Sequence, residues 1–530
     1  LDHRLAMFAF ATVAFFGSLF LQGAFGGSGF APISDRREMN LIVQTPPGSS
    51  LEYTRGKVEE AVALLRQRPE VEYTYASIGT PIPLQAPGVD AATVYIRLTP
   101  KHARELSQDA LGPVMRDALR PIAGAEISVF NSGWGGTFKP VQLQLRGPDQ
   151  AVLNQHAARI RDVVRGVPGA VDVGLSTRNQ KPELEVVVDR GLAGSLGVSV
   201  GQIAQSLRIA FAGFDSGDWV DPTGETRDVM VRLAPEARQR AGDLRTLPLL
   251  VQGQGGGAPG HPSIVPLGQL AAVREGVGPA QISHLDRERV VQIEANVQGL
   301  SLGEVQAEID RRLKDQPLPA GYTIRAGGES ADQAEVFGRI LLALGTAVML
   351  MYLVLVLQFQ SFLDPFTILL SLPLSLIGVV LALLVTGDTL NIMSMIGIIL
   401  LFGIVAKNAI LLIDFAKWAR EDRGLSIRDA LIEAGRIRLR PIVMTSVAIV
   451  AGMLPVAIGA GEGQDFNAPL GRAVIGGVIT STLLTLLVIP TVYETMDGWR
   501  AWIRSKLGRG GAVAHGGGAA PAHAAHMRHE

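Results

Sequence analysis

The chain has 530 residues, a formal net charge of −1 and no cysteine. The near-zero charge gives no sign of nucleic-acid binding, and the lack of cysteine excludes disulfides and thiolate metal sites. Charged residues are crowded between positions 35 and 335, and long uncharged runs lie on either side of that region. This distribution predicts a membrane protein with one large water-facing part.

The first apolar run covers residues 5–25 and is long enough to cross a bilayer once. No convincing small-residue cleavage site follows it, so the run does not have the form of a cleaved signal peptide. We therefore predict a transmembrane helix within residues 1–25. Because the chain opens at Leu1 without an initiator methionine, we also expect it to be a piece of a longer polypeptide.

The water-facing part is predicted to contain four strand–helix–strand units. They cover residues 38–78, 93–130, 141–174 and 290–326. Two such units make one split βαβ sandwich of the ferredoxin-like kind. Because about 115 residues separate the third unit from the fourth, we expect the second sandwich to carry an insertion.

Apolar runs return after the water-facing part and predict five more spans. These are residues 336–357, 365–385, 391–416, 441–460 and 471–493. The link 417–440 carries seven basic residues, so the positive-inside rule places it in the cytoplasm and the water-facing part outside. The Gly/Ala/His-rich tail, residues 508–530, is predicted to be disordered, with metal binding by its histidines as the alternative.

No catalytic motif stands out. The sequence holds no phosphate-binding loop, no His or Cys metal-ligand spacing in the body of the chain and no serine nucleophile elbow. We therefore predict that the protein is not an enzyme and uses no cofactor.

Lys407 lies well inside the apolar run 391–416. A lysine at that depth costs at least about 3 kcal/mol unless it is paired or wetted, so it should face a carboxylate or a water path. The alternatives are snorkelling to a headgroup or a fixed structural pair. Asp414, Arg438 and Thr445 could complete a proton relay, because Lys407–Asp414 and Arg438–Thr445 are each seven residues apart and share a helix face. Asp414 lies toward the cytoplasmic end, where an interfacial charge is the alternative interpretation.

Two strings carry a family resemblance. Gly403-Ile-Val-Ala-Lys-Asn-Ala-Ile-Leu-Leu-Ile-Asp-Phe415 and Arg438-Leu-Arg-Pro-Ile-Val-Met-Thr-Ser446 resemble the C-terminal half of the resistance–nodulation–division (RND) transporters, in their AcrB-like hydrophobe/amphiphile efflux branch. The order of one span, a large outer region and five spans is also similar, and the resemblance covers about residues 1–500.

This resemblance implies an α+β membrane protein of the bacterial inner membrane. A six-helix transmembrane bundle would carry a large periplasmic region of two ferredoxin-like porter subdomains and an inserted docking domain. The first porter subdomain would be residues 35–140, the second 141–177 plus 278–328, and the docking domain 178–277. The implied partners are a periplasmic adaptor protein, an outer-membrane channel and the N-terminal half of the same transporter, within a homotrimer or a mixed trimer.

The resemblance also implies site residues. Lys407, Arg438 and Thr445 match the family's proton relay, whose aspartate pair belongs to the N-terminal half and has no counterpart in this sequence. The positions matching the substrate pocket are Tyr75, Thr80, Ile82 and Tyr95. A place in the core of a strand is an alternative for Tyr95.

The implied function is proton-driven export of amphiphilic or hydrophobic compounds. A heavy-metal exporter of the same superfamily is one alternative, although Met39, Met115 and Met230 are scattered rather than clustered. A membrane scaffold or a protein-secretion partner is the other. Binding of dyes as against copper separates the first two, and proton-dependent transport separates both from the scaffold.

Overall fold

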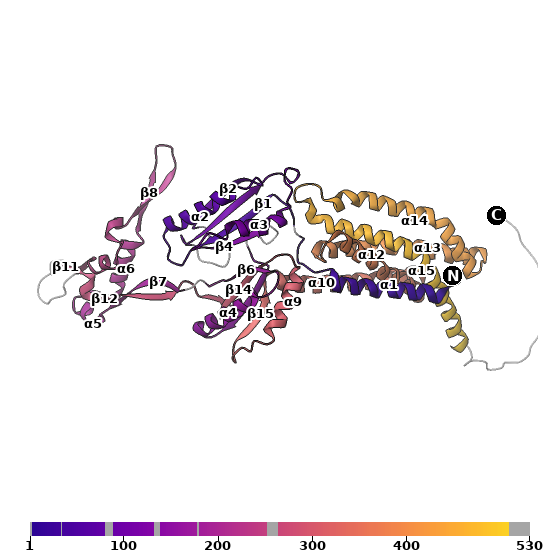
Figure 1. Cartoon of the computed structure of the whole chain (residues 1–530). Helices are drawn as coiled ribbons and strands as arrows, with labels where there is room; N and C mark the ends of the chain where they lie inside the picture. Colours follow the sequence, from indigo (N-terminus) through magenta and orange to yellow (C-terminus); the bar gives the residue numbers. More distant parts are fainter. Residues whose placement is uncertain are drawn as a thin grey trace, which may run out of the picture.

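The computed structural model describes residues 3–32, 34–79, 88–131, 138–177, 180–251 and 263–507. A bundle of long helices forms one end of an elongated molecule, two α/β subdomains lie next to it, and a third subdomain forms the far end (Figure 1). Of the expected features, Thr80, Ile82 and the tail 508–530 lie outside the described residues.

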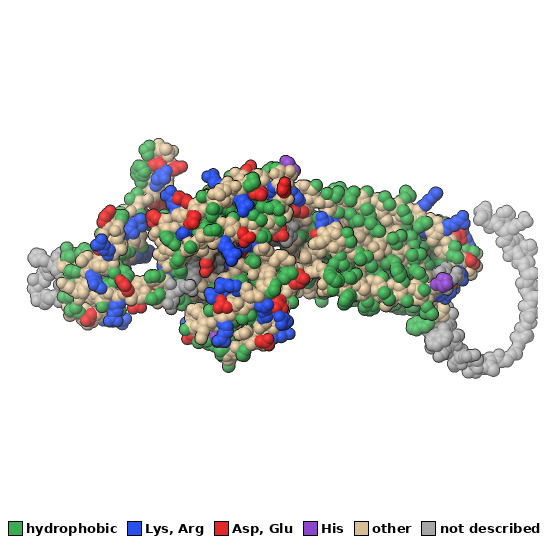
Figure 2. Space-filling view, in the orientation of Figure 1, with side chains coloured by type: hydrophobic (Ala, Val, Ile, Leu, Met, Phe, Trp, Pro, Cys, Tyr) green, Lys and Arg blue, Asp and Glu red, His purple; other side chains and the backbone are tan. Residues whose placement is uncertain are grey.

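Within the described residues, the bundle contains six helical segments long and apolar enough to cross a membrane, which confirms the predicted number. They are α1 (Arg4–Phe25), α10 (Gly328–Phe359), α11 with α12 (Leu363–Leu369, Ser371–Thr386), α13 (Ile392–Arg423), α14 (Ile427–Ile458) and α15 (Ala468–Leu507). The spans that contain α12, α13 and α15 bury more than half of their most apolar stretch, whereas α1, α10 and α14 leave theirs largely exposed. Hydrophobic side chains cover this end of the molecule, and charged ones gather over the α/β subdomains (Figure 2).

The helices extend beyond the apolar runs. Helix α10 begins eight residues before Val336, directly after a strand. Only residues 424–426 separate α13 from α14, so the basic link 417–440 predicted between these two spans is almost entirely helical and forms the ends of the two helices. The interruption at Leu370 has a local cause, because Pro373 has no backbone N–H to donate to the preceding turn.

The first α/β subdomain comprises the strands and helices between residues 38 and 131. They are β1 (Glu38–Gln44), α2 (Leu51–Leu65), β2 (Val71–Ile78), β3 (Ala91–Leu98), α3 (Gln108–Leu119) and β4 (Glu126–Asn131). The strand order is β2-β3-β1-β4, all antiparallel, as in a ferredoxin-like sandwich. Ser50 and Ser107 cap the two helices, which bury one face of the sheet.

The second α/β subdomain has the same topology, but an insertion separates its first three elements from the others in the sequence. It contains β5 (Val141–Gly147), α4 (Gln150–Arg165), β6 (Ala170–Leu175), β13 (Ser283–Leu285), β14 (Glu288–Val297), α9 (Leu302–Leu313) and β15 (Thr323–Gly327). Strand β14 pairs with β5 on one side and with β6 and β13 on the other, and β15 lies on the far edge of β5. The predicted insertion therefore enters between β6 and β13.

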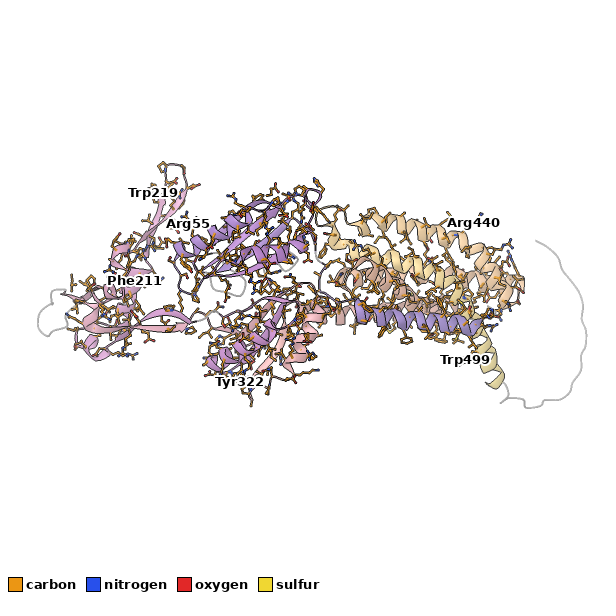
Figure 3. All side chains as sticks on the ribbon, in the orientation of Figure 1. Arg55, Phe211, Trp219, Tyr322, Arg440 and Trp499 are labelled. Atoms are coloured by element: carbon orange, nitrogen blue, oxygen red, sulfur yellow. The ribbon has the colours of Figure 1, made fainter. Side chains whose placement is uncertain are left out.

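The inserted subdomain stands on two antiparallel strands, β7 (Gln180–Val188) and β12 (Ala271–Pro279). Its core gathers around four short helices and a small sheet. These are α5 (Arg190–Ser195), α6 (Val200–Phe211), α7 (Ala241–Arg245), α8 (Leu267–Leu270), β10 (Pro248–Val251) and β11 (Ser263–Pro266). The hairpin of β8 (Phe214–Val220) and β9 (Thr226–Val231) projects away from that core with Trp219 near its tip (Figure 3).

Candidate functional site

Lys407 lies on an exposed face of α13. Its neighbour Asn408 is buried, so the helix turns the amide inward and the ammonium outward. Within the described ranges Lys407 has no hydrogen bond or ion pair. Gly403 and Asp414 are exposed on the same face. Asp414 is about 10 Å from Lys407 along the helix, too far for an ion pair.

Arg438 and Thr445 lie on α14, half-buried beside α13. The Arg438 guanidinium lies 5.2 Å from the ring centroid of Phe415, and its Nε is buried without a hydrogen-bond partner. The Thr445 hydroxyl donates to the Ile442 carbonyl at 3.0 Å.

The short link between α13 and α14 makes the two helices antiparallel neighbours. Arg438 lies beside Phe415 of α13. Because the helices are antiparallel, the seven residues from Arg438 to Thr445 rise about 10 Å in the direction from Phe415 to Lys407, so Thr445 is level with Lys407. The structure therefore brings Lys407 and Thr445 to one level on adjoining helices, and it places Arg438 about two turns away, beside Phe415 and level with Asp414. Such a group can hold and release carboxylates, because it offers an ammonium, a guanidinium with a free donor and a hydroxyl.

The two described pocket positions lie on neighbouring strands of the first sheet. Tyr75 and Tyr95 are opposite each other in the β2–β3 register, and the ring centroids of Tyr73 and Tyr95 are 6.2 Å apart. On β3 the residues Val94 and Ile96 enter the core, so Tyr95 faces the other side and the core alternative is wrong. Partial burial raises the pKa of the Tyr95 phenol, with the neighbouring Glu38 carboxylate adding to the effect. Tyr73 was not predicted from the sequence, although its period-two spacing with Tyr75 could have indicated it.

The three methionines of the described water-facing part do not form a cluster open to solvent. Met39 and Met115 are fully buried in the core of the first subdomain, and Met230 is exposed on the inserted hairpin. Within the described residues no group of three or more His, Cys, Asp or Glu side chains could hold a metal ion.

Two ion pairs in the helical bundle were not anticipated. Arg4 of α1 pairs with Glu494 of α15, and Arg472 Nη1 lies 2.7 Å from Asp388 Oδ2. Arg472 also donates to the Ala457 carbonyl at 3.0 Å, which fixes the start of α15 against the end of α14. Opposite charges at the ends of separate spans are the sequence signal for such pairs, but it does not say which ends meet.

The chain is 30% identical over 504 residues to the swarming motility protein SwrC of Bacillus subtilis, covering 94% of this chain and 46% of that protein. Two crystal forms of a heavy metal efflux pump are similar in structure, with TM-scores of 0.79 and 0.78 at 26% and 25% identity. Each covers 94% of this chain and 50% of the pump, so the chain spans about half the length of these relatives.

The family model of the AcrB/AcrD/AcrF proteins matches residues 1–497, which is nearly the whole described chain. These proteins are RND efflux transporters and not enzymes. The chain belongs to the AcrB/AcrD/AcrF family.

Proposed function

We propose that the chain is the C-terminal half of a proton-driven exporter of amphiphilic compounds, working as the inner-membrane permease of a three-part efflux system. The observation that carries this proposal is Lys407, an ammonium at bilayer depth that has no partner among the described residues and is level with Thr445. An unpaired charge of this kind is costly in lipid, so the exposed face needs a complementary surface.

An N-terminal half with carboxylates at the same depth would supply that surface. A carboxylate there pairs with Lys407 while ionised and releases it on taking up a proton. Thr445, level with Lys407, can accept or donate as this pair changes, and Arg438, about two turns nearer the α13–α14 link, can hold a second carboxylate of that half. Proton uptake thereby changes the contact between the two halves.

The proposed orientation follows from the basic residues near the α13–α14 link. Lys417, Arg420, Arg423 and Arg436 lie on the helical extensions that flank it, which favours a cytoplasmic position. The α/β subdomains then face the periplasm. The inserted subdomain is farthest from the membrane, where an adaptor protein and an outer-membrane channel of a trimeric assembly would bind (Figure 1).

The tyrosines of the first sheet favour amphiphilic substrates. Tyr73 and Tyr75 are exposed, and together with Tyr95 they offer apolar rings with polar tips. Heavy-metal export is the second candidate, because the similar solved structures are of a heavy metal efflux pump. The burial of Met39 and Met115 in the first core favours the amphiphile.

The test of the relay is Lys407→Ala in cells that produce the chain together with its N-terminal half. We expect proton-dependent dye efflux to fall to the level of cells without the transporter. Lys417→Ala is the matched control, since this lysine of the same helix donates to the Phe359 carbonyl at 2.9 Å and has a structural partner. Efflux retained in Lys407→Ala would refute the relay.

The substrate class is tested by measuring the export of two different substrates in parallel. Cells are loaded with an amphiphilic dye or with copper, and Tyr95→Ala is compared with the parent protein. A loss of dye export with copper tolerance unchanged supports the amphiphile. Copper export without dye export would establish the metal exporter instead.

A further inference from the structure

Residues 459–467, between α14 and α15, contact the chain segment that enters the first α/β subdomain. The Asp465 carboxylate accepts the Ser34 hydroxyl at 2.9 Å, the Asp35 backbone N–H at 3.0 Å and the Lys101 ammonium at 3.4 Å. Glu462 adds an ion pair with Arg37 at 3.0 Å. We call residues 459–467 the α14 seat.

The α14 seat binds a buried part of the first subdomain. Asp35 is buried, and its own carboxylate binds the Arg104 guanidinium and the Gln108 backbone N–H at the start of α3. Its carbonyl accepts from the Gly463 N–H at 2.9 Å. Displacement of the seat is therefore carried directly into β1 and α3.

Residues 387–391, between α12 and α13, contact a different part of the molecule. Leu390 exchanges backbone hydrogen bonds with the segment after α1, from Gly29 N at 3.1 Å and to the Gly27 carbonyl at 3.3 Å. In that same segment Ser28 accepts from the Gly303 N–H of α9 at 3.0 Å, and Phe30 packs against the core of the second subdomain. We call residues 387–391 the α13 seat.

Each seat adjoins one of the two helices that carry the candidate relay. Helix α13 begins directly after the α13 seat and carries Lys407, whereas α14 ends directly before the α14 seat and carries Arg438 and Thr445. The second subdomain is thus attached at the start of the lysine helix and the first subdomain at the end of the arginine helix, and Arg472 of α15 bridges Asp388 of the α13 seat and the Ala457 carbonyl of α14.

We propose that the α14 seat, through Asp465, converts a shift between α13 and α14 into a movement between the two α/β subdomains. Asp465 is a positioning residue, since it acts through the first subdomain and not by contact with cargo or protons. This inference rests on the proposed function and adds to it the element that couples the membrane helices to the outer region.

This chain has no cysteine, so two labels can be placed in it without removing any thiol of its own. Spin labels are attached to Ala63→Cys in α2 and Gln155→Cys in α4, two exposed positions. Double electron–electron resonance then measures the distance between the two subdomains. The complete transporter is compared with Lys407→Ala, which mimics a released relay, and with Lys407→Ala plus Asp465→Ala. Asp286→Ala removes a carboxylate from an exposed ion pair with Arg146 and serves as the matched control.

We expect Lys407→Ala to shift the inter-label distance and Asp465→Ala to remove that shift. Asp465→Ala alone should lower export about a hundredfold, the loss expected from the three hydrogen bonds that this carboxylate accepts. A shift that survives Asp465→Ala, with export still dependent on Lys407, overturns the coupling and leaves the proposed function intact. Export that persists in Lys407→Ala overturns the proposed function and the coupling with it.

A disulfide in place of the Ser34–Asp465 contact tests whether a loss of export in Asp465→Ala is due to misfolding. Ser34→Cys and Asp465→Cys together remove the polar contact and allow a disulfide in its place. Export should be low under reducing conditions and recover on oxidation, because the disulfide restores the attachment. Export that is blocked by oxidation shows that the seat has to open during transport, which refutes the inference.

Discussion

Asp172 joins the two α/β subdomains through a single carboxylate oxygen. Its Oδ2 accepts Arg116 Nε at 2.9 Å, Asn296 Nδ2 at 2.9 Å and the Val129 backbone N–H at 3.3 Å. Asn296 donates also to the Val129 carbonyl at 3.0 Å. Val129 lies on β4, the edge strand of the first sheet, so these side chains of the second subdomain satisfy an edge that would otherwise be open.

The free-energy cost of Asp172→Ala follows from these contacts. The substitution removes a charge-assisted hydrogen bond, which costs about 2 kcal/mol, and Arg116 keeps Gln298 and the Val129 carbonyl as partners. Asp172 also has a φ of 51°, a left-handed conformation that alanine adopts at a cost of about 1 kcal/mol. The sum of about 3 kcal/mol corresponds to a roughly hundredfold rise in the local opening equilibrium.

The assay is hydrogen exchange at the Val129 amide in the whole chain in detergent. We expect its protection to fall about a hundredfold in Asp172→Ala and about tenfold in Asp172→Asn, which keeps one acceptor and tolerates the backbone conformation. Asp286→Ala is the control for loss of an exposed carboxylate. Val129 protection in Asp172→Ala within about threefold of the parent would refute the reasoning, because the carboxylate would then not hold the edge strand.

Two further predictions concern the helix packing and the hairpin. A Cβ on Gly378 would lie 2.1 Å from the Gly476 carbonyl oxygen, so Gly378→Ala should destabilise the bundle by about 2 kcal/mol. A Cβ on Gly403 meets nothing within 4 Å, so Gly403→Ala is the control. Equal thermal unfolding of the two variants would contradict this prediction. The Thr223 hydroxyl, with the Arg227 guanidinium, lowers the pKa of Asp221 from 3.8 to about 2. Since the folded pKa is the lower one, the stabilisation of the turn is fully present above about pH 4 and is lost as the pH falls through about 2. Amide exchange in the turn, corrected for intrinsic rates, should show this loss, and Asp221→Asn should abolish the pH dependence.

The sequence predicted the number and order of the membrane helices because hydropathy reports which residues can lie in lipid. It did not predict where each helix ends, since a helix continues in water wherever its backbone is supported. Helix α10 starts at Gly328 because β15 leads straight into it, and the basic residues 417–440 are helical because α13 and α14 extend beyond their apolar runs. Apolar length is therefore a lower bound on helix length.

The candidate relay was also visible in the sequence, because Lys407 is conspicuous in an apolar run and its neighbours have helical spacing. The seats were not visible, since Asp465 and Ser34 are 431 positions apart and each is an ordinary polar residue in a loop. Asp172 is similar, because its role depends on a left-handed backbone and on a strand edge from another subdomain. Local patterns carry no information about such pairings.

Lys407 and Asp465 differ in their number of partners, and the proposed mechanism requires this difference. A group that responds to a proton has to change partners easily, whereas a group that transmits the response has to keep them. One exposed ion pair is worth less than about 1 kcal/mol, while a charge crossing 100 mV of membrane potential supplies about 2.3 kcal/mol. A seat held by one such pair would therefore break before it moved the first subdomain. The three donors on Asp465, at about 1 kcal/mol each, exceed that energy, so the seat can carry the movement without coming apart.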